Sequence, residues 1–424
     1  MRNVRSFSHK THCIVKPTTL PTAPLNFEPL ILSEDDQLSM PIQLLMAYRG
    51  VMSADRCEEA FLRGLIEFPH LTGKLTRGLH GRLDKIVPSE DPFSLELCEV
   101  ENVLDFEDLA SFSLEKLSND FLPSQAESLF KARLTIFRNA GLSVLGVRVS
   151  HAAVDGTGLA CFISNCTAAL RGVEPLKVFH DRSYGFGSYM EGGMNEVPEG
   201  YTAAEFMAIK DDAADFIPTY FVIPVERARR FFGASSVLDA RLLLGAWLCA
   251  GVAGRDERFS ELALWCDARG TNSIPATYTG NVGCYLTFPL RGVGAEAIAQ
   301  ELRKIATRGG FERIATTYGM IKRAEAKGHP LGWGGTATGM LQLNLVPHVV
   351  EGTNFGHGIP SFALLLSRNS SGLRISLTPD ASRYLVECSL LIGLGDALVE
   401  QCQIAGLGPK VWCCGGDELE MSRP

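Results

Sequence analysis

The spacing of apolar residues divides the first part of the chain into alternating strands and helices. Leu142 to Val149 alternates and is β-branched, which predicts a strand. The apolar run from Gly158 to Cys166 predicts a buried helix, and the residues between the two form a strand-to-helix connection. Apolar residues at helical spacing predict another helix from Ala54 to Phe68, which Pro69 ends. This alternation continues to about Gly172 and favours a layered α/β domain.

The pattern weakens in the middle of the chain and then resumes. Glycines and acidic residues gather between residues 179 and 214, so we expect residues 181–214 to form a crossover loop or linker. A strand over 218–224 and a helix over 237–251 then open a second series of elements, with Ser236 in a capping position. We therefore predict an N-terminal domain over residues 1–180 and a C-terminal domain over residues 215–424.

The composition limits the classes of function. The chain has 424 residues, of which 46% are hydrophobic and 21% charged, as in soluble globular proteins of two domains. The net charge of −8 does not favour nucleic acid or an anionic membrane surface as a partner. We see no secretory apolar segment and no uncharged helical run long enough to cross a bilayer, so we expect a cytoplasmic protein without a membrane partner.

The cysteines and the common catalytic motifs exclude several other chemistries. The twelve cysteines are scattered without any C-x-x-C pair, and several lie in apolar stretches, so we expect reduced thiols. The sequence has no H-E-x-x-H or paired-cysteine metal motif, and we predict no metal site. It also lacks the G-x-S-x-G turn of serine hydrolases.

The strand-to-helix connection carries the strongest chemical signal. His151 follows the strand, and Asp155 and Gly156 follow it in an H-x-x-x-D-G pattern. Histidine is the side chain that can both take and return a proton near neutral pH. A loop whose two ends are fixed by regular elements is a common place for such a group. His151 is thus a candidate general base, with a hydrogen-bonded structural histidine as the alternative.

Further segments, in this order, carry a resemblance to a known family. They are Leu32 to Leu38 (L-S-x-x-D-Q-L), Leu65 to Leu75 (compare Y-P-L-A-G-R-L), Asp267-Ala268-Arg269 (D-x-R), Gly280-Asn281 (compare F-G-N) and Asn354 to Gly358 (compare D-F-G-W-G). With the His151 motif, they make the chain resemble the BAHD family of CoA-dependent acyltransferases, in the chloramphenicol acetyltransferase-like superfamily.

The resemblance implies a fold and a reaction. It implies two similar α/β domains with mixed sheets and a channel at their interface, in which His151 is reached by acyl-CoA and by the acceptor. His151 would take the proton of the acceptor as it attacks the thioester, and Asp155 would pair with Arg269 to position the loop, with Gly156 beside it. The implied protein is a monomer whose co-substrate is acyl-CoA, with no bound cofactor.

Three positions of the sequence depart from the family pattern. Asn354 replaces an aspartate and His357 a tryptophan, around the retained Gly356. His357 either alters the acceptor site or the domain interface, or reflects drift in a structural loop. Asn344 stands where the family usually has serine or threonine, and its amide could donate to the oxyanion. The alternative is a polar strand residue satisfied by its neighbours.

Three functions follow from these observations. The first is acyl transfer from a CoA thioester to a hydroxyl of a small specialised metabolite, with His151 as general base. The second is N-acylation, or condensation-like chemistry on a carrier-bound thioester. Condensation domains usually show two adjacent histidines in this motif, whereas Ser150 precedes His151 here. The third is a catalytically silent binding protein with the BAHD fold.

Overall fold

The computed structural model describes most of the two predicted domains. The described residues are 12–17, 27–33, 36, 41–78, 83–90, 93–101, 109–110, 112, 114–123, 128–184, 216–267, 269, 274–306, 340–345, 353–366, 372–391 and 393–414. The predicted linker at 181–214 lies outside these ranges except for its first four residues.

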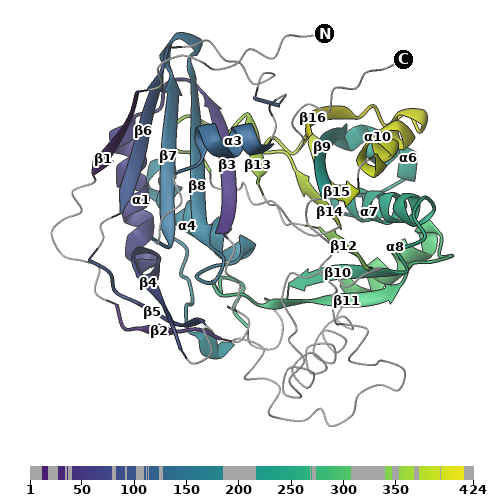
Figure 1. Ribbon diagram of the computed structural model, residues 1–424, viewed down its shortest axis with the longest axis horizontal. Helices are drawn as coiled ribbons and strands as arrows, with labels where there is room; N and C mark the ends of the chain where they lie inside the picture. The colour runs from purple at the N-terminus through teal and green to yellow at the C-terminus, as the bar shows by residue number, and fades with distance from the viewer. Residues whose placement is uncertain are drawn as a thin grey trace.

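The described chain forms two α/β units side by side (Figure 1). The first is built on a six-stranded mixed sheet with the order β1-β6-β7-β8-β3-β13. Its strands are β1 (His12–Pro17), β6 (Ser94–Val100), β7 (Phe130–Phe137), β8 (Leu142–Ser150), β3 (Pro41–Arg49) and β13 (Phe362–Leu365). A small second sheet, β2-β5-β4, consists of β2 (Leu30–Ile31), β5 (Leu83–Val87) and β4 (Lys74–Arg77).

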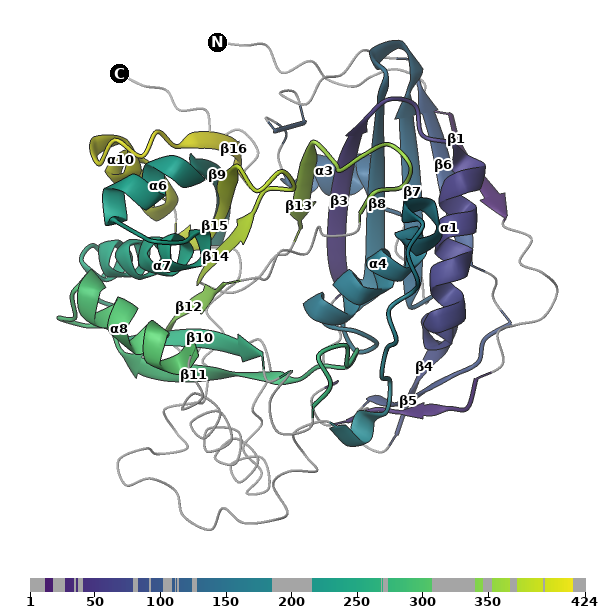
Figure 2. The same ribbon diagram turned by 180° about the vertical axis from the view of Figure 1, so that it is seen from behind.

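Helices cover both faces of the first sheet. Helices α1 (Ala54–Glu67) and α4 (Gly156–Arg171) lie on one face and α3 (Leu114–Phe121) on the other (Figures 1 and 2). Strand β8 shows why: Leu145 and Val147 pack in the core below α1 and α4, whereas Val144 packs with α3. Alternate residues of a strand point to opposite faces, so the apolar alternation of this strand serves two layers. Short 3₁₀ turns complete the unit at η2 (Pro69–Thr72), η4 (Arg138–Ala140) and η5 (Arg182–Tyr184).

The second unit has a seven-stranded mixed sheet with the order β11-β10-β12-β14-β15-β9-β16. Its strands are β11 (Gly283–Pro289), β10 (Glu261–Asp267), β12 (Met340–Asn344), β14 (Gly372–Leu377), β15 (Arg383–Leu391), β9 (Phe216–Pro224) and β16 (Lys410–Cys414). The helices α6 (Val225–Phe232), α7 (Val237–Ala253), α8 (Ala295–Ala306) and α10 (Leu394–Ile404) cover the side of this sheet that faces away from the first unit (Figure 1).

The structure confirms the main elements predicted from the sequence, and their ends follow local chemistry. The side chain of Ser53 accepts the backbone N–H of Arg56 and begins α1, which ends before Pro69. Helix α7 begins in the same way, where Ser236 accepts the N–H of Asp239 at 3.0 Å. Helix α4 is longer than its apolar run because Asp155 caps its first turn and Gly172 ends it at a φ of 67°.

Strand β13 crosses from the second half of the chain into the first sheet. It pairs antiparallel with β3, so that Phe362 lies opposite Ala47 and Leu365 opposite Leu44. The other described strands of the first sheet all precede the predicted boundary between residues 180 and 215, and those of the second sheet all follow it. Strand β13 is the exception, because it follows the boundary but belongs to the first sheet. Strand β13 covers an edge of β3 that would otherwise be unpaired and open to other chains.

An apolar cluster fills the space between the two large sheets. It combines residues of β3 and β13 from the first sheet with residues of β9 and β15 from the second. Members from the two sheets include Leu45, Phe362, Tyr220 and Leu385. The described parts of the two units consequently share one continuous interface core.

The segment 353–358 locks the second half of the chain against the first. The hydroxyl of Tyr48 donates to the carbonyl oxygen of Thr353 at 2.9 Å, and the ring of Phe355 is buried near Tyr48. The Oδ1 atom of Asn354 accepts the N–H groups of Gly356 and Gly358, each at 2.9 Å. Asn354 therefore closes the turn with neutral hydrogen bonds, and no charge is needed for this function.

One cysteine differs from the expectation of reduced thiols. Cys98 in β6 is disulfide-bonded, and Cys13 lies directly opposite it in β1. Directly opposed residues of antiparallel strands have Cα separations within the range that a disulfide spans. Seven other described cysteines are free and buried.

Among the described residues, no single helix combines the length and apolar character needed to span a membrane. Helices α6 and α7 meet that test only when taken together, with a 74° bend between them.

We predict that Gly356→Ala lowers the free energy of unfolding by about 1–2 kcal/mol. Gly356 has a φ of 87°, a region in which a side chain with a Cβ is strained. Gly156→Ala is the matched control, because a Cβ there would meet no atom within 4 Å and the residue has no positive φ. Urea unfolding of both variants is the measurement, and equal stabilities would contradict the assignment of strain to this turn.

Candidate active site

The sheet and a helix hold His151 at a sharp turn. Strand β8 ends at Ser150, and the carbonyl oxygen of Ser150 accepts the N–H groups of Ala153 and Val154 at 3.1 and 3.3 Å. Asp155 then caps α4, its Oδ1 accepting the N–H of Gly158 at 2.9 Å. The loop is thus fixed at both ends, as the sequence predicts.

A buried ion pair joins this loop to the second unit. The Nη2 atom of Arg269 lies 2.7 Å from Oδ1 of Asp155, and their side chains are only 5% and 9% exposed. Arg269 also donates to the carbonyl oxygens of Tyr278 and Gly280 at 2.7 and 2.6 Å, and it pairs with Asp267 at 2.9 Å. Each nitrogen of the guanidinium group therefore has a hydrogen-bond partner. The Asp155 carboxylate is directed at Arg269 and not at an open substrate site.

The charges of this pair depend on each other. Burial raises the pKa of Asp155, and the positive charge of Arg269 opposes that shift. The carboxylates of Asp155 and Asp267 raise the pKa of Arg269 beyond its usual value. Asp155 thus has the position of a structural residue that holds the loop.

Asn281 contacts His151, a relation that the sequence motifs do not reveal. Its Nδ2 donates to the backbone carbonyl oxygen of His151 at 2.7 Å and to Oδ1 of Asp36 at 3.0 Å. The backbone N–H of Asn281 also donates to Oδ1 of Asp36 at 3.1 Å. Asp36 and Asn281 both lie in segments that resemble the family pattern, but nothing in those segments assigns them this contact.

Arg182 holds the middle of the same loop. Its Nη2 donates to the carbonyl oxygen of Ala153 at 2.6 Å, and its Nε lies 3.1 Å from Oδ2 of Asp36. The Arg182 and Asp36 side chains are 4% and 0% exposed. The guanidinium groups of Arg182 and Arg269 each lie 5.7 Å from the centroid of the Tyr278 ring. Arg182 lies in the segment predicted as a linker, and no sequence pattern signals its role.

The environment of His151 favours a neutral imidazole at neutral pH. Its Nδ1 is fully buried although part of the residue remains exposed. Burial lowers the pKa of His151 below its ordinary value, and the charges of Asp155 and Asp36 oppose this change. A neutral ring can accept a proton, which is the state that a general base requires.

Two further histidines lie buried beneath the loop. The rings of His70 and His180 have centroids 4.6 Å apart. The Nε2 atom of His180 lies 2.7 Å from the carbonyl oxygen of Glu67, and its Nδ1 lies 2.8 Å from Oγ1 of Thr279. Burial lowers the pKa of His180 to about 4, with the charge of Arg182 adding to the shift. Burial also lowers the pKa of His70, and His180 and Arg182 add to that effect.

The structure places the predicted residues of the segment 354–358 away from His151. His357 lies next to Gly50, where a Cβ would come within 3.2 Å of its Nδ1 atom. Gly50 follows the end of β3, whereas Pro41 at the start of β3 lies opposite Ser150. His357 thus contacts the first unit at the opposite end of the sheet from the His151 loop. Asn354 and Gly356 lie in the same turn. Gly156 begins α4, where nothing in the structure requires a glycine.

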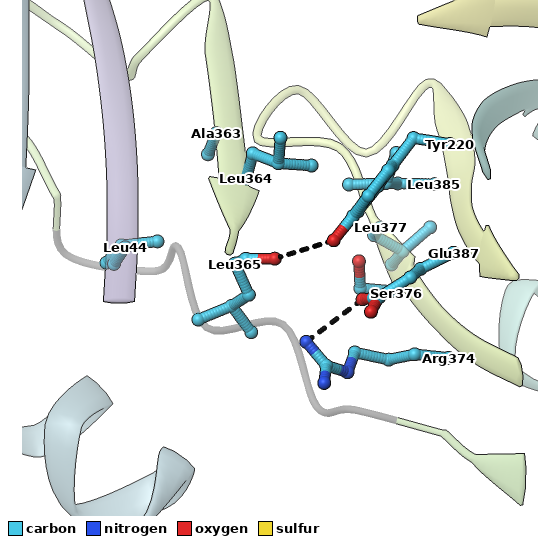
Figure 3. Close-up of a pocket in the computed structure, with 10 residues that line it drawn as sticks. All are labelled: Leu44, Tyr220, Ala363, Leu364, Leu365, Arg374, Ser376, Leu377, Leu385 and Glu387. Carbon is cyan, nitrogen blue, oxygen red and sulfur yellow. Dashed lines mark hydrogen bonds and ion pairs between the residues drawn. The ribbon is translucent and has the colours of Figure 1, made fainter. Parts of the chain in front are cut away.

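A small pocket of about 30 Å³ lies between the two large sheets (Figure 3). Leucine and alanine side chains of β3, β13, β14 and β15 form most of its wall. Arg374 and Glu387 form an ion pair of 3.0 Å at one side, and the hydroxyl of Tyr220 donates to the carbonyl oxygen of Leu365 (Figure 3). The pocket is thus apolar with one internally neutralised charged side.

Strand register relates this pocket to the candidate site. Leu44 lines the pocket and lies opposite Val147 of β8. Val147 precedes His151 by four residues. Arg374 lies opposite Asn344 at the end of β12. Asn344 is half-buried. The pocket therefore borders the strands that lead to both residues.

Comparison with solved structures identifies the fold. Vinorine synthase matches over 93% of this chain and 97% of its own, with a TM-score of 0.66 and 14% identity. TRI101 of F. sporotrichioides, solved with coenzyme A and T-2, matches over 91% and 100%, with a TM-score of 0.67 and 18% identity. The chain has the fold of the BAHD acyltransferases. Neither models of protein families nor curated sequences gave a match.

The BAHD fold is also related to that of condensation domains. The first condensation domain of the CDA synthetase matches over 86% of this chain and 89% of its own, with a TM-score of 0.59 and 17% identity. The two-unit α/β architecture expected from the sequence is confirmed by these likenesses. The TM-scores show that the arrangement of elements is shared. At such low identities, the chemistry has to be inferred from the residues of the site.

The buried cysteines of α1 and α4 do not offer a nucleophile. Burial raises the pKa of Cys57 to about 12, and it also raises the pKa of Cys161 and Cys166. A thiol becomes a good nucleophile as the thiolate, which these environments disfavour. In the described part of the chain, no group of three or more His, Cys, Asp and Glu side chains is arranged to hold a metal ion.

We predict that Asp155→Ala lowers the free energy of unfolding by roughly 3–5 kcal/mol, because it leaves the buried Arg269 without its main partner. Asp155→Asn keeps an oxygen that can cap α4, and its loss should be smaller by about 1 kcal/mol. Urea unfolding measures both values. An Asp155→Ala protein of wild-type stability that lacked activity would instead indicate a direct role in the chemistry.

We predict that stability falls as the pH is lowered from about 6.5 to about 4. The folded protein holds His180 neutral, so its stabilising effect is complete above the unfolded pKa of 6.5 and is lost as the pH approaches 4. His180 alone accounts for up to about 3 kcal/mol. His180→Gln removes this titration, so the gap between the two proteins should narrow with falling pH in urea unfolding. A constant gap would exclude a buried neutral His180.

Proposed function

We propose that this protein is an acyl-CoA-dependent acyltransferase that acts on a hydroxyl of a small specialised metabolite. The observation that carries the proposal is His151, held neutral on a rigid loop where the two units meet. The fold adds support, because the TRI101 structures hold coenzyme A together with a small acceptor molecule, T-2 or deoxynivalenol.

In the proposed reaction His151 acts as general base on the acceptor. The imidazole accepts the proton of the acceptor hydroxyl as the oxygen bonds to the thioester carbonyl carbon. The tetrahedral intermediate then collapses, the carbon–sulfur bond breaks, and the imidazolium returns the proton to the CoA thiolate. The products are an ester and free CoA, and no acyl-enzyme forms. The protonated buried cysteines agree with a route that uses no protein nucleophile.

The oxyanion of the intermediate needs a fixed hydrogen-bond donor. We propose Asn344 for this role, because it ends β12 opposite Arg374, a residue that lines the pocket between the sheets. Its amide N–H₂ can donate without a change of charge.

The proposed enzyme works as a monomer, since Asp155, Arg269, Asn281 and Asp36 of one chain complete the surroundings of His151. We also propose a cytoplasmic location, in which the seven free buried thiols would stay reduced; the disulfide of Cys98 is the exception to this pattern.

Condensation-like chemistry or N-acylation is the second candidate. The likeness to the first condensation domain of the CDA synthetase favours it. The residue before His151 is Ser150, and its carbonyl oxygen is occupied by two hydrogen bonds within the loop. Two comparisons separate these alternatives. The first presents the same acyl group as a CoA thioester and as a thioester on a carrier protein. The second offers hydroxyl and amine acceptors to the same donor.

We predict that the purified protein releases free thiol from acyl-CoA when it is given a panel of small alcohols. His151→Ala should lower the rate by a factor of about 10²–10⁴, because no other general base replaces the ring. Thiol release followed with a chromogenic disulfide, with products identified by mass spectrometry, is the measurement.

His180→Gln is the matched control, because it changes a buried histidine of the same unit that lies outside the proposed reaction path. It should keep most of the activity at neutral pH. Equal activity of wild type and His151→Ala would overturn the proposed mechanism, and absence of turnover with every donor would favour a binding protein.

A further inference from the structure

Three polar side chains form one row across adjacent strands of the first sheet. Gln43 of β3 lies directly opposite Arg148 of β8, and Arg148 lies directly opposite Lys131 of β7. Residues that lie directly opposite each other on neighbouring antiparallel strands point to the same face of the sheet. These three residues are called the polar row below.

The polar row lies on the face of the sheet that meets the second unit. Alternate residues of a strand share a face, and Leu45 of β3 and Val144 of β8, which share this face, belong to the apolar cluster between the two large sheets. One row above, Gly146 lies so close to the carbonyl oxygen of Phe121 that a Cβ would overlap it. Helix α3 thus ends against the sheet one row above the polar row, and β7 and β8 continue beyond it (Figure 1).

The side chains of the polar row are unpartnered. Within the described part of the chain, no hydrogen bond or ion pair joins any of the three to another group. Arg148 is half-buried, and only its Nε is both fully buried and unpartnered, so its two Nη atoms remain accessible at the end of the side chain. The acid whose charge acts on Arg148 is Glu96, which is already paired with Arg133 at 2.7 Å.

This arrangement is unfavourable for the protein alone. Like charges directly opposite on neighbouring strands repel each other, and Arg148 faces Lys131 in this way. Burial and the charge of Arg133 lower the pKa of Arg148, which shows that its charge is poorly compensated. The chain carries a net charge of −8, yet no acid of the described residues neutralises the row. The polar row therefore has the character of a site that receives an anion from outside the chain.

The polar row lies close to the His151 loop. Ser150 is the next residue of β8 on the same face after Arg148, and residues two apart in a strand are separated by about 7 Å. The backbone N–H of Ser150 donates to the carbonyl oxygen of Leu129 at 2.7 Å, so the chain before β7 accompanies β8 to the start of the loop. The phosphates of CoA are separated from its thioester by the whole pantetheine arm. An anion bound this close to His151 therefore comes from the acyl group or from the acceptor.

We propose that the polar row is a subsite for a carboxylate of the substrate, with Arg148 as the residue that determines this specificity. The inference rests on the proposed function and names its substrate class, in which the acyl group or the acceptor carries a carboxylate. The guanidinium group of Arg148 binds the carboxylate through two parallel N–H groups. Lys131 supplies a second positive charge, and the amide of Gln43 supplies a further N–H donor.

Paired substrates test the specificity and distinguish the two sources of the carboxylate. One pair compares succinyl-CoA with butyryl-CoA at a fixed acceptor, and the other compares hydroxy acids with their amides at a fixed donor. In the wild type, the carboxylate-bearing member of one pair should have a kcat/KM about 10–100-fold higher. Arg148→Gln should abolish this preference, mainly through KM. The absence of a preference in both pairs, or its persistence in Arg148→Gln, would overturn the proposal.

Stability separates this role from a structural one. Arg148→Gln should keep or raise the free energy of unfolding in urea, because it removes the repulsion from Lys131. Arg138→Gln is the matched control, since Arg138 belongs to the same unit but is exposed and paired with Glu99 at 2.5 Å. This control should keep the wild-type substrate preference. An Arg148→Gln protein that is less stable but keeps the wild-type preference would show that Arg148 is structural.

Protection from phenylglyoxal tests the subsite without turnover. The reagent modifies accessible arginines, and mass spectrometry of peptides follows the modification of Arg148. The carboxypropyl thioether of CoA, or the hydroxy acids, should protect Arg148, whereas the butyl thioether and the amides should not.

The two proposals fail in different ways. Charge-selective protection of Arg148 in a protein that releases no thiol would refute the proposed function and retain the carboxylate subsite. A His151-dependent enzyme with neither this protection nor a carboxylate preference would do the reverse.

Discussion

The buried pair of Asp155 and Arg269 is the interaction on which the site depends. Neither charge could remain buried alone, so the first unit and the segment after β10 must come together before either is stable. The same pair caps α4 on one side and binds the carbonyls of residues 278 and 280 on the other. The position of Asn281 beside His151 follows from that contact, because Asn281 comes directly after Gly280.

Local sequence was a good guide to elements and a poor guide to distant contacts. The strand before His151, the helix after it and the capping of α7 by Ser236 follow from spacing over a few residues, and these could be predicted. The pair of Asp155 and Arg269 spans 114 positions and followed from the family resemblance. The contact of Asp36 with Asn281 spans 245 positions, and β13 returns to β3 across most of the chain. No pattern in single-sequence spacing encodes such partners.

Arg182 and His357 show two kinds of position that spacing along the chain leaves undetermined. Arg182 lies in a stretch with weak periodicity, and its importance comes from burial between Asp36 and the loop, which composition does not express. His357 attracted attention because a titratable ring replaced an apolar one. In the structure it lies beside Gly50 at the far end of β3, where it contributes to contact between the halves. Unusual chemistry in a motif is therefore weaker evidence for catalysis than a buried network around the base.

The pocket has an electrostatic character that complements the site. Glu387 neutralises Arg374 at its wall, so the pocket offers polarity without net charge. Charged ligands would gain little there, while a neutral molecule could exchange hydrogen bonds with either partner.

The passage of β13 into the first sheet has a consequence for how the protein folds. Strand β3 forms early in synthesis, but its last neighbour emerges only after more than three hundred further residues have been made. Closing so long a loop is slow because its entropy must be lost before the new contacts compensate. The nascent first sheet thus carries an open edge until β13 has been made. Completion of that edge also brings the two halves of the site together, so assembly of the site is a late event in the life of the chain.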